Sequence, residues 1–196
     1  MKQSKVLSLL LLISILLTCG CSNKKLITEE SILQKADEVL DKGKAESAIE
    51  YNNFILGTQA KILNAILDLN WDSNSEAFNS EIKNLIQLLD NGLKIIDSIE
   101  VYQHGEDLKE AFKVQLHMHK DMVENDYLEL FELVNIEPAS EQEMKELSSK
   151  IDSITKRMEA KEAPIDEKLF TAQRRFAKKY GLKLQATEIQ EKIDNL

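Results

Sequence analysis

The chain has 196 residues, of which 43% are hydrophobic and 30% are charged, with only six Gly and two Pro. This length is sufficient to bury one core, and so few turn-forming residues argue against an all-β fold, so we expect one mostly helical domain. The formal net charge of -9 argues against a nucleic-acid-binding protein, which needs a basic surface to displace counterions. The sequence contains no recognisable catalytic motif.

Residues 1–20 have the pattern of a bacterial signal peptide. Two lysines, Lys2 and Lys5, precede the apolar run 6–17, which reads VLSLLLLISILL and is followed by small residues. A bilayer core requires about 20 apolar residues in a helix, so this run is too short to span it. The segment is therefore expected to direct export and then to be removed.

The end of this segment resembles a lipoprotein signal. Gly20 directly precedes Cys21, which would become the first mature residue and carry covalent lipid, palmitate included. Ordinary secretion, or Cys19 as the anchor, are the alternatives. Lipid consumes the only thiol of the mature chain, so we expect no disulfide, no thiol catalysis and no further cofactor. Ser22 is not the acidic residue that retains some lipoproteins in the inner membrane, which favours the outer membrane or the cell surface.

The mature chain is expected to begin with an anchor, a polar tether and a short helix within residues 21–44. The short helix covers 31–41, opens with a capping box of Ser31 and Gln34, and ends near Gly43.

Residues 45–184 are expected to form an up-down-up-down four-helix bundle. Apolar residues recur at alternating steps of four and three, which is typical of bundle seams, in helices over 45–70, 75–102, from after Gly105 to 134, and 140–180. The fourth helix opens with Ser140 and Glu143 as a capping box, contains Pro164, where we expect a kink or a restarted turn, and stops at Gly181. The tail, 185–196, is expected to hold at most a turn or two within 187–193.

Several short segments carry a resemblance to known proteins. They are the lipoprotein signal, 48–52 (AIEYN) with Gln59 one heptad further on, 124–127 (ENDY), 161–168 (KEAPIDEK) and 176–180 (FAKKY). Together, across 45–184, they resemble a family of small bacterial surface lipoproteins of leptospires and Bacteroidota, described only as surface proteins of unknown function. The resemblance implies a location and an all-helical lipoprotein domain, and it supplies no catalytic residue.

Four polar residues occupy otherwise apolar seams and are the main candidate site. Asn52 and Gln59 lie one heptad apart on the first long helix, and His119 and Asp126 lie one heptad apart on the third. In a bundle these two helices are parallel, so Gln59 and His119 are expected at one level, with Gly92 leaving room beside them. The group forms either a hydrogen-bonded polar layer that fixes helix register or a ligand cavity, unless the seams are misassigned.

A second candidate is a basic patch at the end of the fourth helix. It comprises Arg174, Arg175, Lys178 and Lys179, which either complement the helix dipole or contact anionic lipid headgroups near the membrane. A metal site is not expected, because no histidine has Glu three positions before it and His117 and His119 point to different faces.

Together these features favour the hypothesis of a non-enzymatic, lipid-anchored envelope protein whose helical domain binds a protein or a surface polymer. The alternative is a carrier or sensor of a small ligand held in a polar-lined cavity within the bundle. An enzyme is the third and least favoured interpretation.

Overall fold

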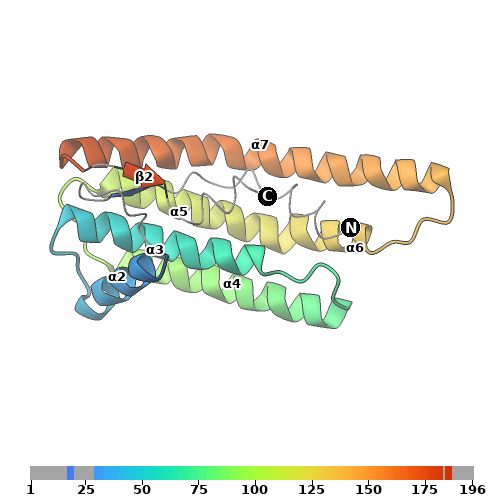
Figure 1. Cartoon of the computed structure of the whole chain (residues 1–196), viewed down its shortest axis with the longest axis horizontal. Helices are drawn as coiled ribbons and strands as arrows, with labels where there is room; N and C mark the ends of the chain where they lie inside the picture. Colours follow the sequence, from blue (N-terminus) through green and yellow to red (C-terminus); the bar gives the residue numbers. More distant parts are fainter. Residues whose placement is uncertain (1–16, 20–28, 183, 187–196) are drawn as a thin grey trace.

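The computed structural model describes residues 17–19, 29–182 and 184–186 (Figure 1). The predicted anchor Cys21, most of the predicted signal peptide and the turns expected within 187–193 lie outside these residues. The elements in chain order are β1 (Leu17–Cys19), α2 (Glu29–Lys42), α3 (Ala48–Leu67), α4 (Ser75–Ser98), α5 (Glu106–Asp121), the π-helical turn η1 (Met122–Asp126), α6 (Tyr127–Val134), α7 (Glu141–Lys179) and β2 (Leu184–Ala186).

The predicted all-α class is confirmed. The long helices lie lengthwise beside one another, with α7 running along the continuous rod of α5, η1 and α6, and α2 packing on α3 (Figure 1). The only sheet among the described residues is a short antiparallel ladder in which Leu17 faces Ala186 and Cys19 faces Leu184. The described part of the chain includes no helix with the length and apolar character needed to cross a bilayer.

Side chains that accept backbone hydrogen bonds define the starts of three helices. Ser47 caps α3, Asn74 caps α4, and Ser140 caps α7 by accepting from the backbone N–H of Glu143 at 3.2 Å. The predicted Ser140 box is therefore confirmed at this end. The box predicted at Ser31 is wrong, because α2 already begins at Glu29 and Ser31 lies within its first turn.

Glycines in the left-handed region end two helices, as the sequence predicted. Gly43 (φ 69°) follows α2, and Gly181 (φ 64°) follows α7. After Gly181 the N–H of Leu182 donates to the carbonyl of Ala177 at 2.8 Å, so the chain folds back over the end of α7.

Two of the long helices are shorter than predicted. The first starts at Ala48 rather than 45 and the second ends at Ser98 rather than 102. A parallel bridge between Lys44 and Glu100 holds the chain before one helix beside the chain after the other. This contact competes with further helix formation at both ends.

The helix interruption expected at Pro164 is absent, and one occurs elsewhere. The helix α7 continues through Pro164 from Glu141 to Lys179. The third predicted helix instead contains η1, where the N–H of Tyr127 donates to the carbonyl of Met122, five residues earlier. Apolar spacing alone does not reveal such a turn, because the residues on either side of it keep the helical pattern.

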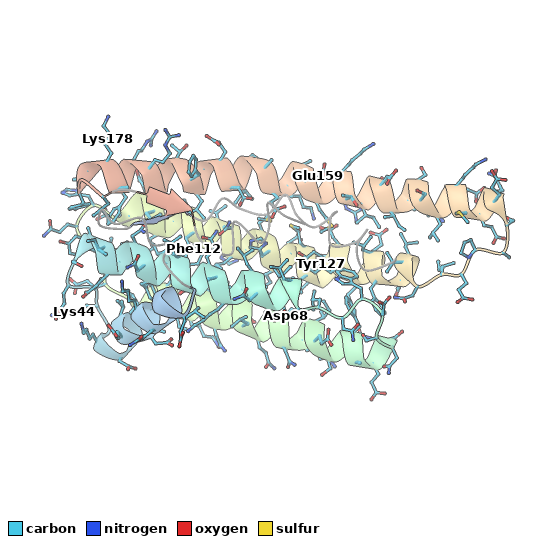
Figure 2. The ribbon with its side chains drawn as sticks, viewed as in Figure 1. Lys44, Asp68, Phe112, Tyr127, Glu159 and Lys178 are labelled. Carbon is cyan, nitrogen blue, oxygen red and sulfur yellow. The ribbon has the colours of Figure 1, made fainter. Side chains whose placement is uncertain are left out.

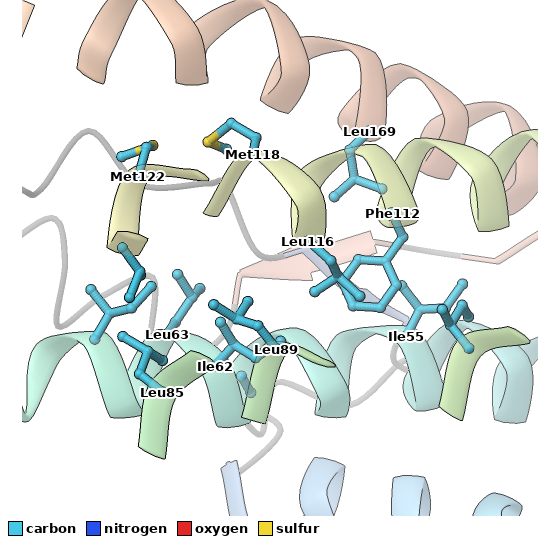
Figure 3. Packing of buried hydrophobic residues seen from close by; sticks show 14 of the residues in the cluster. Ile55, Ile62, Leu63, Leu85, Leu89, Phe112, Leu116, Met118, Met122 and Leu169 are labelled. Carbon is cyan, nitrogen blue, oxygen red and sulfur yellow. The ribbon is translucent and has the colours of Figure 1, made fainter. Parts of the chain in front are cut away.

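The core surrounds α3, which is buried on every side from Tyr51 to Ala60, and is completed by the inward faces of α2, α4, α7 and the rod of α5, η1 and α6 (Figure 3). At one end Phe78 and Phe131 stack with ring centroids 3.8 Å apart, and the buried Trp71 contacts both Phe78 and Tyr127. This aromatic cluster fastens the loop between α3 and α4 onto α6.

The room expected beside Gly92 is largely filled. A Cβ built on Gly92 would lie 3.5 Å from Ile62 Cδ1 and 3.6 Å from Leu116 Cδ1, which is ordinary contact. Gly105 is different, because a Cβ there would lie 2.7 Å from both the Tyr102 carbonyl oxygen and a ring carbon of Tyr51. The close approach of the chain thus requires glycine at 105 and does not require it at 92.

Candidate functional site

All four polar seam residues lie in the interior. Asn52 is 0% exposed, Gln59 4%, His119 1% and Asp126 1%. The helical seams were therefore assigned to the correct faces. Buried polar groups need hydrogen-bond partners, and the partners decide what these residues do.

The partners come from neighbouring helices and not from within the predicted set. Gln59 on α3 donates from Nε2 to Oε1 of Gln115 on α5 at 3.0 Å, and Gln115 donates to Asp166 on α7 at 2.8 Å. This chain of bonds joins three helices at one level. Gln59 and His119 were expected at one level of the bundle; the residue of α5 that Gln59 contacts is Gln115, one helical turn before His119.

A second polar link joins α3 to α7 near the N-terminal end of α3. Gln173 donates from Nε2 to Oδ1 of Asn52 at 3.2 Å, and both residues are buried. The two links fix the register of α3 against its neighbours, as expected of a polar layer.

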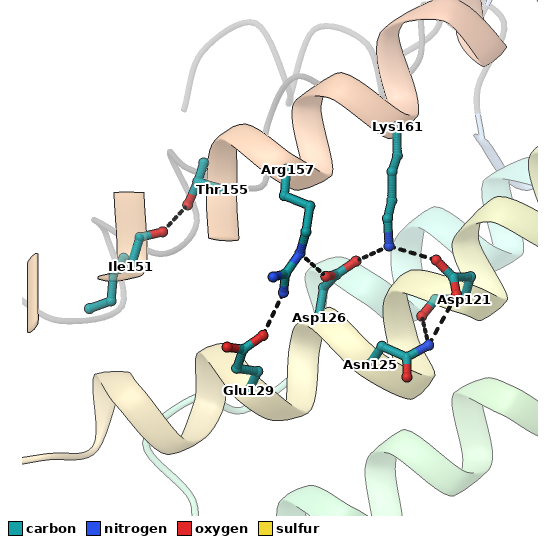
Figure 4. Close-up of polar contacts among 8 residues, drawn as sticks. All are labelled: Asp121, Asn125, Asp126, Glu129, Ile151, Thr155, Arg157 and Lys161. Atoms are coloured by element: carbon teal, nitrogen blue, oxygen red, sulfur yellow. Dashed lines mark hydrogen bonds and ion pairs between the residues drawn. The ribbon is translucent and has the colours of Figure 1, made fainter. Parts of the chain in front are cut away.

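Asp126 belongs to an ion network between the rod and α7 (Figure 4). Its buried carboxylate accepts from Nε of Arg157 at 2.8 Å and from Nζ of Lys161 at 2.8 Å. Arg157 also pairs with Glu129, and Lys161 with Asp121 at 2.6 Å. Two partly exposed cations thus neutralise one buried anion. Such neutralisation is required because a desolvated carboxylate without a partner would be strongly destabilising.

The π-helical turn η1 makes this network possible. In a regular α-helix two residues five apart point about 140° away from each other. In η1 the backbone bond spans five residues, so one turn separates Asp121 from Asp126 and both can face α7. Lys161 reaches both carboxylates for this reason (Figure 4).

His119 is buried without a hydrogen bond within the described part of the chain. Neither ring nitrogen has a partner there. Burial lowers the pKa of His119 from 6.5 to about 4, so the imidazole is neutral at pH 7. A neutral ring with two unpartnered nitrogens makes His119 the least satisfied member of the predicted set.

Glu162 on α7 is a further buried titratable group, outside the four polar seam residues predicted from the sequence. It is 4% exposed, and its Oε1 has no partner among the described residues. Burial, assisted by the negative charges of Asp166 and Glu159, raises the pKa of Glu162 to about 8. Tyr127 is buried nearby, and its pKa is raised by burial and by the charges of Glu162 and Asp126. The carboxyl of Glu162 is therefore mostly protonated at neutral pH.

The predicted basic patch lies on the exposed surface of α7. Arg174, Arg175, Lys178 and Lys179 are all exposed, and Lys178 projects away from the other helices in Figure 2. Three of them line a surface groove of about 550 Å³ together with Thr171, Ala177 and Leu182. The guanidinium of Arg174 lies 5.1 Å from the ring centroid of Phe170.

The sequence held a signal for several missed residues. Gln115, Glu162 and Gln173 each continue a step of three or four from an apolar seam residue, as Asp126 does. A seam defined to include every residue three or four positions from an apolar seam residue would contain all three. The pairing with Arg157 and Lys161 had a weaker signal, since two cations four residues apart occur on many exposed helix faces.

No protein-family model, no curated protein and no solved structure matches the chain. In the described residues, no group of three or more His, Cys, Asp or Glu is arranged to hold a metal ion.

Proposed function

We propose that this chain is a lipid-anchored protein of the bacterial cell envelope, acylated on Cys21 and located in the outer membrane or at the cell surface. Its helical domain acts as a non-enzymatic interaction module for a protein or surface-polymer partner. The observation that carries the proposal is the N-terminal pattern of Lys2, Lys5, the apolar run 6–17 and Gly20 before Cys21. The resemblance to small surface lipoproteins points to the same location.

We further propose that the domain is an up-down-up-down four-helix bundle. Its four rods are α3, α4, the rod of α5, η1 and α6, and α7. Short connections between successive rods support antiparallel neighbours, and the polar links of Asn52 and Gln59 support a single register. A single register would hold the exposed helix faces in constant positions relative to one another.

Processing before Cys21 would remove residues 1–20 and with them β1. The mature chain would then lack both the pairing of β1 with β2 and the contact of β1 with α3. The helices and their polar links come wholly from residues after the cleavage point.

The proposal is tested by fractionating cells that express the native chain or Cys21→Ala. The native chain is expected in the membrane fraction and Cys21→Ala in the soluble fraction, with the same helical circular dichroism spectrum for both purified proteins. Crosslinking in intact cells, followed by mass spectrometry, then identifies the partner. A specific partner should be crosslinked to the native chain and not to Cys21→Ala. An unchanged membrane location of folded Cys21→Ala would contradict the anchor.

A second candidate function is a carrier or sensor for a small polar ligand. The observation that favours it is a set of buried polar atoms on His119, Glu162 and Tyr127 that have no hydrogen-bond partner among residues 17–19, 29–182 and 184–186. A ligand or bound waters would satisfy them. Native mass spectrometry of the protein purified from its own host tests this function: a retained small molecule lost in His119→Leu would support it, and a bare chain mass would count against it.

A further inference from the structure

The end of α7 concentrates positive charge that makes no ion pair with the described part of the chain. Residues 168–182 include five basic side chains and no acidic one, in a chain whose net charge is -9. Within the described part of the chain, no carboxylate lies at ion-pair distance from Arg174, Arg175, Lys178 or Lys179. The nearest acidic residue along the helix, Glu167, accepts instead from the Thr171 hydroxyl at 3.4 Å.

The helix dipole explains only part of this charge. Its field acts within the last turn of a helix, which accounts for Lys178 and Lys179 at the end of α7. Arg174 and Arg175 lie a further turn before that end. The helix dipole therefore does not explain why these two positions carry positive charge.

Arginine is used sparingly in this protein. Only three of the 25 basic residues are arginines: Arg157, Arg174 and Arg175. Arg157 makes two of the four cation–carboxylate contacts of the ion network. The adjacent pair on α7 offers the same planar donor groups, which match phosphate as well as carboxylate, to the solvent.

Three of these cationic side chains line one surface groove. Arg174, Arg175 and Lys178 line it on the polar side, and Ala177 and Leu182 contribute apolar surface. The left-handed turn at Gly181 brings Leu182 back over the helix. Cations beside a small apolar surface suit a ligand with a phosphate and an apolar portion.

We propose that this groove binds the phosphate of an anionic phospholipid headgroup. The occupant follows from charge complementarity and from the apolar surface beside the cations. The inference rests on the proposed lipid anchor for bringing α7 close to a bilayer, and it adds a second, non-covalent contact that fixes how the domain lies on the membrane.

The three arginines allow a direct test by NMR of their side-chain Nε–H groups. The full-length protein is placed in nonionic detergent micelles that contain phosphatidylglycerol, phosphatidylcholine or neither. Phosphatidylglycerol should shift the signals of Arg174 and Arg175, whereas the ion-paired Arg157 should stay unchanged as the internal control. Equal shifts with phosphatidylcholine, or no shift, would overturn the proposal.

Two further measurements distinguish a phospholipid from free phosphate and test whether the basic side chains are required for binding. Sodium phosphate at matched ionic strength should leave the Arg174 and Arg175 signals in place, and an equal shift would mean a free-phosphate site instead. The triple variant Arg174→Gln/Arg175→Gln/Lys178→Gln should bind phosphatidylglycerol on the order of a hundredfold more weakly, from roughly fivefold per cation.

A matched control removes the same charge elsewhere. Lys83, Lys94 and Lys150 are exposed and make no ion pair within the described residues, and their triple change to Gln should weaken binding by about threefold or less. An equal loss in both triples would show nonspecific charge attraction. Micelles keep the chain in solution whether or not Cys21 is acylated, and the mass of the same sample reports acylation, so failure of the groove and failure of the anchor are distinguishable.

Discussion

Glu162→Gln should make the protein's stability less sensitive to high pH. In the folded protein Glu162 has a pKa of about 8, raised first by burial and then by the charges of Asp166 and Glu159, against an ordinary value of 4.5. Between these two values the folded state binds more protons than the unfolded state. Stability is therefore lost as pH rises from 4.5 through 8, which is the opposite of an ion-paired carboxylate.

The size of the effect follows from the shift. A difference of about 3.5 units corresponds to roughly 5 kcal/mol over the whole range, at about 1.36 kcal/mol per unit. Between pH 5 and pH 8 the Glu162 contribution amounts to roughly 3 kcal/mol. Gln has nearly the same shape and does not titrate, so the variant should gain that amount relative to the native protein over this interval.

Urea unfolding at pH 5, 6, 7 and 8 measures the difference. Fluorescence of Trp71, the single tryptophan, reports on the aromatic cluster, and circular dichroism reports on the helices. Glu146→Gln on the same helix is the control for a lost negative charge, because Glu146 is exposed and is not among the charges that raise the Glu162 pKa, and this variant should follow the native pH dependence closely. A constant free-energy difference between Glu162→Gln and the native protein from pH 5 to 8 would refute the burial argument.

Four further changes test other parts of the interior by the same unfolding measurement. His119→Leu should remove a loss of roughly 3 kcal/mol that the native protein suffers as pH falls from 6.5 to 4, because the folded state holds this ring neutral while the unfolded state protonates it; an unchanged acid limb would contradict this. Arg157→Gln and Lys161→Gln should each cost about 1 kcal/mol, but together about 3 kcal/mol or more, because either cation alone can neutralise the buried carboxylate that they share; strictly additive losses would argue against sharing. Gly92→Ala should stabilise the protein by roughly 0.5 kcal/mol, since its Cβ meets only ordinary contacts and alanine favours helix, and a clear loss would mean tighter packing there. Gly105→Ala should cost about 1–3 kcal/mol, since its Cβ has no space, and a neutral result would show that the chain yields.

Apolar periodicity predicted most of the helical architecture. The steps of four and three on α4 and α7 come from residues that do face the core, because each of these helices buries one stripe. In contrast, α3 is buried on every side from Tyr51 to Ala60, so its seam is only part of its buried surface. Local capping was predictable where a side chain and a backbone N–H are three residues apart, as at Ser140. It failed at Ser31, where the helix starts two residues earlier.

The polar interior was predictable as a set of buried positions and not as a set of pairs. Asn52, Gln59, His119 and Asp126 are all buried, but their partners depend on the axial offset between helices. An offset of one turn exchanges His119 for Gln115 as the residue facing Gln59. The sequence of one chain does not specify that offset.

The π-helical turn was beyond prediction from periodicity. One added residue in η1 changes which side chains face α7, and its stabilising contacts come from Lys161 and Arg157, more than 30 positions away in the sequence. Pro164 is the converse case. A proline predicts a break, yet the packing of α7 against the rod keeps the helix continuous.

The lipid anchor on Cys21 is tested most directly by the mass of the first mature peptide from membrane-purified protein. A peptide that begins at Cys21 and carries the added mass of a diacylglyceryl group is the predicted result. A peptide that contains Cys21 unmodified, or one that still continues into residues 17–20, would contradict the proposed lipoprotein.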